Sequence, residues 1–218
     1  MLRNYASRLS ILGPAVLLIS VVITTSANPE YNHLRSPLSR LIIEGDYGWL
    51  TNLGLIFFSF TSILFAYPIQ HHLKKEGSPQ IWIFTPALVI CFGLSCFLSA
   101  IFQDDLDSGG IFIPNSTGEV YLQGIIHDLS ARLSFFFLFL MIIFISFHSS
   151  YIRKHRSVLV GSIAIIIISA ISATFFLFTS LQPLQNNLWN IFGLFQKGAL
   201  IPGIIWIQMM SIILIQDV

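Results

Sequence analysis

Six long apolar stretches, separated by shorter polar segments, fill the sequence. They cover residues 9–27, 48–69, 81–102, 123–148, 157–181 and 190–215. Each approaches or exceeds the roughly 20 mostly apolar residues that a helix needs to cross a bilayer. Helices are favoured there because they satisfy their own backbone hydrogen bonds in lipid. The pattern predicts an all-α integral membrane protein, a bundle of six transmembrane helices that forms a single membrane domain over residues 1–218.

The composition agrees with this interpretation. Of the 218 residues, 55% are hydrophobic and only 10% are charged, whereas soluble domains carry about 25% charged residues. The net charge of +1 leaves no basic excess that would indicate nucleic acid as a partner. We therefore expect membrane lipids as partners, and we expect any activity to be built from helix ends and loops.

Charged residues are distributed unevenly between the two sides of the predicted bundle. Seven lysines and arginines fall on one side: Arg3, Arg8, Lys74, Lys75, Arg153, Lys154 and Arg156. Loops of the other side contain Arg35 and Arg40 together with seven acidic residues: Glu30, Glu44, Asp46, Asp104, Asp105, Asp107 and Glu119. Because basic residues favour the cytoplasmic side, we expect cytoplasmic N- and C-termini. The expected location is the cell (inner) membrane if the source is bacterial.

The fourth stretch begins with ionisable residues, although a charge inside a membrane helix costs roughly 2.5–3.5 kcal/mol. His127 shares one helix face with Ser130 and Ser134, and Asp128 and Arg132 are four residues apart on a neighbouring face. Such residues usually face a protein interior or a wet cavity. We therefore expect groups from other helices to compensate them.

Two other stretches bring ionisable groups to the same outer side. The third stretch ends before Asp104 and Asp105, and the sixth contains Gln196 and Lys197 near its start. We expect these helices to meet in a polar, ligand-binding cluster near the outer face. Its predicted members are Asp104, Asp105, His127, Asp128, Arg132 and Lys197.

The leading interpretation of this cluster is recognition or handling of a lipid-like or other amphipathic small molecule. Buried acidic and basic groups suit a headgroup or an anionic substrate, and the neighbouring phenylalanines suit an apolar chain. Those phenylalanines are Phe135, Phe136, Phe137 and Phe139. A transporter of this small size would work as a homodimer.

Two alternatives stay open. An intramembrane hydrolase would use Asp105 and His127 as catalytic residues, with or without the assistance of a metal ion. Hydrolytic zinc usually has three firm ligands, often with two or more histidines, so we predict no metal and no cofactor. In the second alternative, the chain is a structural or assembly subunit of a membrane complex, and the cluster only fixes helix packing.

Three short motifs, taken in their order along the chain, resemble those of one family. The first includes Gly48-Trp49 and Asn52 within "YNHLRSPLSRLIIEGDYGWLTNLGLIF", and the third is "GLFQKGAL" at the start of the sixth stretch. The second consists of Phe102, Asp105, Gly124 and His127. Together they resemble the domain-of-unknown-function-998 family of six-helix membrane proteins, with Gln103 in place of a proline and Lys197 in place of an arginine. The resemblance implies six helices and marks these positions, but it implies no reaction.

Overall fold

The computed structural model describes residues 2–75, 79–102, 122–149, 152, 155–180 and 191–216. Within these residues the chain forms helices and no strand, which confirms the all-α class. The helices are α1 (Leu2–Ala27), α2 (Leu38–Glu44), α3 (Gly48–Lys75), α4 (Pro79–Ile101), α5 (Leu122–His148), α7 (Arg156–Ser180) and α8 (Phe192–Gln216). The long helices match the six predicted stretches to within a few residues at most ends, with larger extensions at the start of α1 and the end of α3.

Five of the described helices are long and apolar enough to cross a membrane: α1, α3, α4, α5 and α7. This result supports a multi-pass membrane protein. The helix α8 is not among the five, although it has 25 residues. Its sequence is mostly apolar and includes Gln196, Lys197 and Gln208.

The short helix α2 lies in a segment that the hydropathy pattern predicted as loop. It has only seven residues, too few for an apolar window to reveal it. Leu38 and Leu41, three positions apart, are both buried against the bundle, so packing stabilises this helix.

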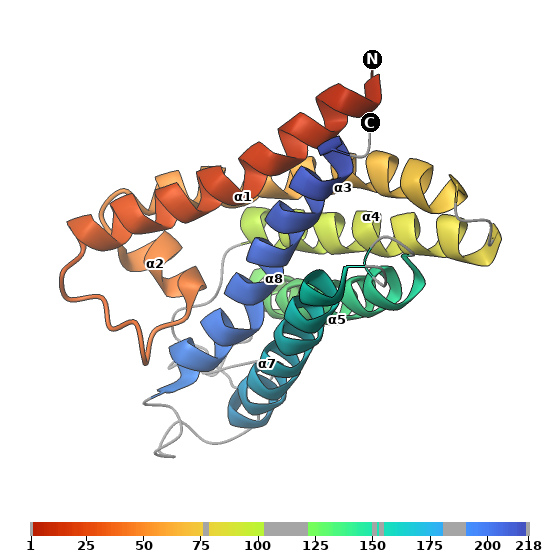
Figure 1. Ribbon diagram of the computed structural model, residues 1–218. Coiled ribbons are helices and arrows are strands. Elements are labelled where there is room, and N and C mark those ends of the chain that lie inside the picture. Colours follow the sequence, from red (N-terminus) through yellow and green to blue (C-terminus); the bar gives the residue numbers. More distant parts are fainter. Residues whose placement is uncertain are drawn as a thin grey trace.

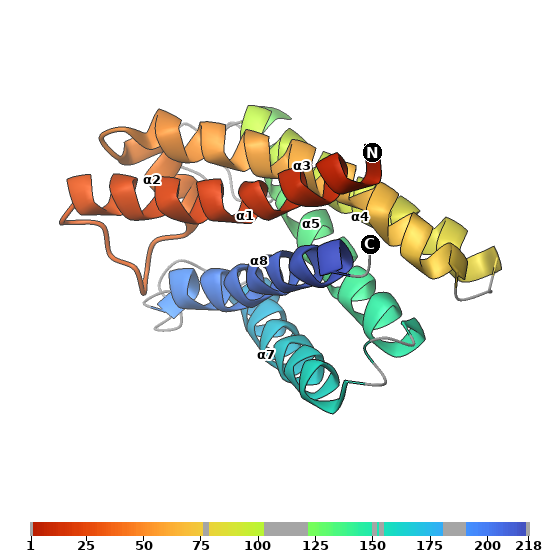
Figure 2. The same ribbon diagram turned by 45° about the horizontal axis from the view of Figure 1, so that its top comes forward.

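The long helices pack against one another in chain order from α1 to α5, but the last helix, α8, also packs against the first. Helix α1 packs along α3, α3 along α4, and α4 along α5, whereas α8 lies between α7 and α1 (Figures 1 and 2). The start of α1 and the end of α8 lie at the same end of the bundle (Figure 1).

Small residues let α1 and α3 approach closely. A Cβ atom added to Gly13 would collide with Thr61, and one added to Gly54 would collide with Ser20. Close backbone approach at small residues is a common source of helix association in membranes. The pair α1 and α3 thus forms a tight unit whose outer surface is apolar.

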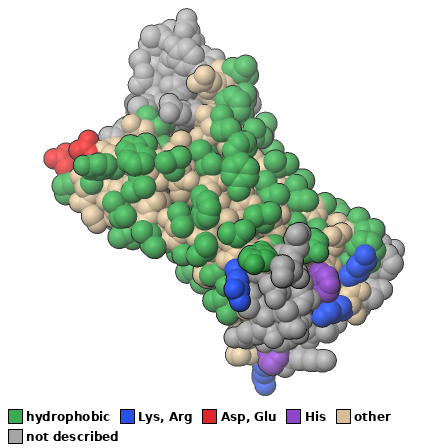
Figure 3. All heavy atoms as spheres, turned by 90° about the horizontal axis from the view of Figure 1, so that it is seen from above, with side chains coloured by type: hydrophobic (Ala, Val, Ile, Leu, Met, Phe, Trp, Pro, Cys, Tyr) green, Lys and Arg blue, Asp and Glu red, His purple; other side chains and the backbone are tan. Residues whose placement is uncertain are grey.

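The two ends of the bundle differ in charge. We call the end at which α1 ends and α3 and α5 begin the α2 end, and the opposite end the basic end. Described residues of the basic end include Lys74, Lys75 and Arg156, whereas Glu30 and Asp46 lie at the α2 end. On the face drawn in Figure 3, lysine, arginine and histidine side chains gather at one end and acidic ones at the other.

Candidate functional site

His127 on α5 is fixed against the end of α4. Its Nδ1 atom lies 2.8 Å from the backbone oxygen of Ser99 and 2.8 Å from that of Phe102. Ser99 lies in the last turn of α4, where helix geometry leaves carbonyls without an intrahelical donor, and Phe102 directly follows the helix. Because carbonyls only accept, Nδ1 must carry the proton, and in the neutral ring Nε2 is then the acceptor. His127 therefore caps the neighbouring helix.

A small cavity lies beside His127, lined by residues of α2, α3, α4, α5 and α8. Its volume is about 50 Å³, far below the roughly 300–1,000 Å³ of typical small-molecule sites. Its polar lining residues are Ser39, Cys96, Ser99, His127, Ser134 and Gln196. Such a space accommodates water but is too small for a lipid headgroup.

Gln196 connects this cavity to the start of α2. Its Oε1 atom accepts a hydrogen bond of 2.6 Å from the backbone N–H of Leu38, the first residue of α2. That N–H is one of the donors that a helix start leaves without a partner. Gln196 thus makes a structural contact and lines the cavity, although the predicted cluster omitted it. Its position beside Lys197, in an otherwise apolar helix, was the available signal.

Lys197 does not line the cavity. Its Nζ atom donates hydrogen bonds to the backbone oxygens of His33 and Ser36, each 2.8 Å long, and lies 5.0 Å from the centre of the Tyr31 ring. Side chains of consecutive helical residues point about 100° apart, so those of Gln196 and Lys197 form hydrogen bonds with different segments. Lys197 holds the connection between α1 and α2.

The backbone of α8 reinforces this attachment. The N–H of Gly193 donates to the oxygen of Arg35 at 3.1 Å, and the N–H of Leu194 donates to the oxygen of Leu34 at 2.9 Å. A Cβ atom on Gly193 would meet backbone atoms of Ser36, so this position requires glycine. The first turn of α8 and residues 33–36 therefore form one backbone junction.

Asp128 and Arg132 form the predicted pair on α5, but the contact is long. Nη2 of Arg132 lies 4.0 Å from Oδ2 of Asp128, with the two side chains 20% and 21% exposed. Hydrogen bonds from nitrogen to oxygen are normally 2.7–3.2 Å. In the described part of the chain, no other ion pair or hydrogen bond is made by Arg132.

An aromatic wall lies next to this pair. The Phe135 ring packs against Phe176 of α7 at 5.4 Å, and Phe176 stacks on Phe192 of α8 at 4.8 Å. Phe135 also lines the small cavity. On α5 it lies between the cavity and Arg132, so the cavity and Arg132 are on different sides of the wall.

Asp104 and Asp105 lie outside the described residues, so their predicted convergence with His127 is not seen. Among the residues described, no group of three or more histidine, cysteine, aspartate or glutamate side chains is placed to hold a metal ion. The hydrolase alternative depends on Asp105, and it stays a prediction. The rest of the predicted cluster is divided among three places: the end of α4, the α1–α2 connection and the outer face of α5.

A family model described as "Protein of unknown function (DUF998)" matches residues 11–213. It covers more than half of the chain and confirms the resemblance found from the three motifs. No curated protein and no solved structure matches the chain.

Proposed function

This chain belongs to the DUF998 family, and we propose that it binds an amphipathic small molecule through an anionic group held by Arg132. The proposal keeps the ligand class predicted from the sequence. It narrows the binding residues to one face of α5.

The incomplete pairing of Arg132 carries this proposal. Arg132 lies ten residues into α5, which is roughly 15 Å along the helix axis. A guanidinium at this depth needs strong partners and has five N–H donors, yet its contact with Asp128 is 4.0 Å long. Phosphate and carboxylate groups fit its two-pronged geometry.

Apolar side chains suited to the rest of such a molecule follow along the same helix. Phe136 is four residues after Arg132, hence on the same face, and it is one of the exposed large hydrophobic residues. Its ring lies 5.6 Å from that of Phe137. A ligand with its anionic group at Arg132 would extend its chain over these rings toward the middle of the bilayer.

The contacts of His127 and Lys197 favour packing roles for these two residues. Both use their donors on backbone carbonyls of other segments. We therefore assign neither to the ligand. This division reconciles the binding interpretation with the structural one, because different members of the predicted cluster serve different purposes.

Binding of dodecyl phosphate to the purified full chain, in a neutral detergent, tests the proposal. Replacement Arg132→Gln should weaken binding at least about tenfold, equivalent to about 1.4 kcal/mol, while Arg132→Lys should retain part of it. The matched control is Arg156→Gln, which removes an exposed arginine at the basic end and should leave the affinity unchanged.

A second variant separates ligand binding from a structural ion pair. Replacement Asp128→Asn removes the carboxylate that competes for Arg132, so the affinity for dodecyl phosphate should stay equal or rise. Equal affinities of the wild type and Arg132→Gln would refute the proposal. So would a weaker affinity in a folded Asp128→Asn protein.

We further propose that α8 is a sixth span and that both termini are cytoplasmic. Helix α8 has 25 residues, roughly 37 Å at 1.5 Å per residue, and it packs along α1 and α7, which are both candidate spans. Basic residues near the start of α1 and the end of α3 indicate the cytoplasmic side. Reporter fusions at the two termini should both be active in the cytoplasm; activity on opposite sides would contradict the sixth span.

A further inference from the structure

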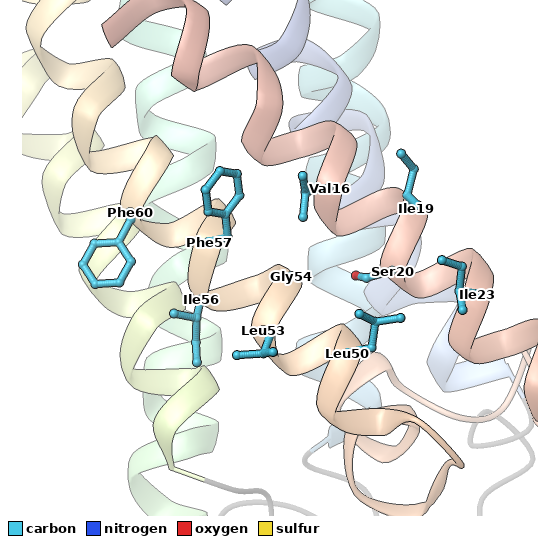
Figure 4. Close-up of a pocket in the computed structure, with 10 residues that line it drawn as sticks. All are labelled: Val16, Ile19, Ser20, Ile23, Leu50, Leu53, Gly54, Ile56, Phe57 and Phe60. Carbon is cyan, nitrogen blue, oxygen red and sulfur yellow. The ribbon is translucent and has the colours of Figure 1, made fainter. Parts of the chain in front are cut away.

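A long apolar groove runs between α1 and α3 on the outside of the bundle. It encloses about 500 Å³, within the range of small-molecule sites. Its lining residues are Val16, Ile19, Ser20 and Ile23 from α1, and Leu50, Leu53, Gly54, Ile56, Phe57 and Phe60 from α3. Figure 4 shows the apolar side chains of both helices along it, with Ser20 and Gly54 between the helices.

The floor of the groove offers no polar group to a ligand. Ser20 is its only hydroxyl residue, and its Oγ atom donates a 2.7 Å hydrogen bond to the oxygen of Leu17 in its own helix. Because α1 and α3 are both candidate membrane spans, the medium beside the groove is hydrocarbon. The groove therefore suits an apolar chain.

The length of the groove matches one leaflet of a bilayer. On α3 it extends over the eleven residues from Leu50 to Phe60, roughly 15 Å along the axis. This is about half of the roughly 30 Å hydrocarbon core. A membrane-spanning helix from a second copy would contact the full thickness of the hydrocarbon core. An acyl chain that enters at the α2 end occupies only half of that thickness, as the groove does.

A strained turn lies where the groove reaches the α2 end. Tyr47 has a φ angle of 61°, a left-handed conformation that is rare for a bulky residue. The N–H of Gly48 closes the turn on the oxygen of Gly45 at 2.9 Å. Strain of this kind is kept only where the surroundings impose it and is frequent at binding sites.

Side chains of α1 and of Asn28, the residue that follows it, hold this turn in place. The amide of Asn28 accepts from the N–H of Asp46 at 2.8 Å and donates to its oxygen at 2.9 Å. The hydroxyl of Thr24 donates to the oxygen of Tyr47 at 3.3 Å. Thr24 lies in the last turn of the helix that forms the other wall of the groove, and Asn28 directly follows that helix, so these hydrogen bonds join the turn to the end of α1.

The turn carries an exposed carboxylate and two exposed aromatic side chains. Tyr47 and Trp49 are 59% and 60% exposed, and Asp46 between Gly45 and Tyr47 is also exposed. Exposed tyrosine and tryptophan are typical of the headgroup level of a membrane. Aromatic faces beside a carboxylate attract ammonium groups.

We propose that the α1–α3 groove binds one acyl chain of a phospholipid whose ammonium-bearing headgroup is held by Asp46, Tyr47 and Trp49. The site is separate from Arg132, and it depends only on insertion of α1 and α3 in the membrane. It would make this pair of helices a fixed lipid site at the leaflet of the α2 end.

Native mass spectrometry of the full chain, released from nanodiscs of equal parts phosphatidylethanolamine and phosphatidylglycerol with identical acyl chains, tests this site. The wild type should retain one phosphatidylethanolamine. Replacement Leu53→Trp fills the groove from an exposed position and should lower the retained fraction about tenfold. The matched control Leu94→Trp, at an exposed position of α4, should retain the lipid as the wild type does.

The headgroup contact has its own variant. Replacement Asp46→Asn should abolish the preference for phosphatidylethanolamine over phosphatidylglycerol while the chain stays folded. Undiminished lipid retention in Leu53→Trp would contradict binding of an acyl chain in the groove. Equal retention of both lipids by the wild type would contradict the headgroup contact. A wild-type dimer that Leu53→Trp dissociates would show that a second copy occupies the groove and would equally overturn the proposal.

Discussion

The side-chain nitrogen of Lys197 lies 2.8 Å from the backbone oxygen of Ser36, although 161 positions separate these residues in the chain. The contact joins the start of α8 to the connection between α1 and α2. A lysine amine in a low-dielectric setting forms strong hydrogen bonds with carbonyls. The junction therefore fixes where the last helix packs against the first.

Replacement Lys197→Met should lower the stability of the protein. It removes two charge-assisted hydrogen bonds, a loss of about 2 kcal/mol in the free energy of unfolding. Thermal unfolding in detergent measures this change. Lys75→Met, at an exposed lysine of the basic end, is the control and should have little effect; an unchanged unfolding midpoint in Lys197→Met would mean that the junction is not held by this amine.

Replacement Gly193→Ala should disrupt the same junction through sterics. The added Cβ atom would meet backbone atoms of Ser36, which cannot move aside as the end of a side chain can, whereas at Gly161 on α7 nothing lies within 4 Å. Gly161→Ala should be neutral or stabilising, by up to about 1 kcal/mol, because alanine favours helix. Both variants change helix propensity in the same way, so the difference between their unfolding midpoints reports the contact of Gly193 with Ser36. Similar midpoints in both variants would contradict this close approach.

His127 should be more important for stability than for any chemistry. Replacement His127→Ala leaves the carbonyls of Ser99 and Phe102 without their donor, at a cost of about 1–3 kcal/mol. In His127→Asn the amide nitrogen takes roughly the position of Nδ1, so it should restore part of the loss. Thermal unfolding of the wild type, His127→Asn and His127→Ala measures the order of their stabilities. A fully stable His127→Ala protein would favour the hydrolase alternative.

A hydrogen bond between α7 and α8 offers a test deep in the bundle. Nε1 of Trp206 donates to Oγ of Ser162 at 2.9 Å, and both residues are buried. Replacement Ser162→Ala would leave a buried N–H without an acceptor and should cost about 1–3 kcal/mol. Ser169 on the same helix is also buried, but its hydroxyl finds no partner among the described residues, so Ser169→Ala should cost less. Equal midpoints would contradict the role of this bond.

Much of the fold could be predicted because lipid imposes simple rules on each stretch of chain. Apolar windows located all the long helices, since a span must be apolar and must satisfy its backbone groups itself. The seven-residue helix α2 escaped because packing of Leu38 and Leu41, and not its own composition, stabilises it. The window for α8 was found at 190–215, and the helix covers Phe192–Gln216.

The candidate site was predictable only in part. Spacing alone paired Asp128 with Arg132, because residues four apart on a helix must be neighbours. It could not assign partners to His127 or Lys197, because these lie on other elements. Their acceptors are backbone oxygens of α4 and of residues 33–36, and every residue has such an oxygen, so no side-chain pattern marks the ones that are used.

The sequence by itself determined where the long helices lie along the chain, which family the chain belongs to, and that Glu30 and Asp46 lie at the opposite end from Lys74 and Lys75. These properties depend on consecutive residues and on the solvent that surrounds them. The tertiary structure alone decided that Lys197 binds the α1–α2 connection, that Gln196 reaches the small cavity, and that α1 and α3 enclose a groove. Those relationships depend on how each helix is rotated about its axis, which is settled only when its neighbours pack against it.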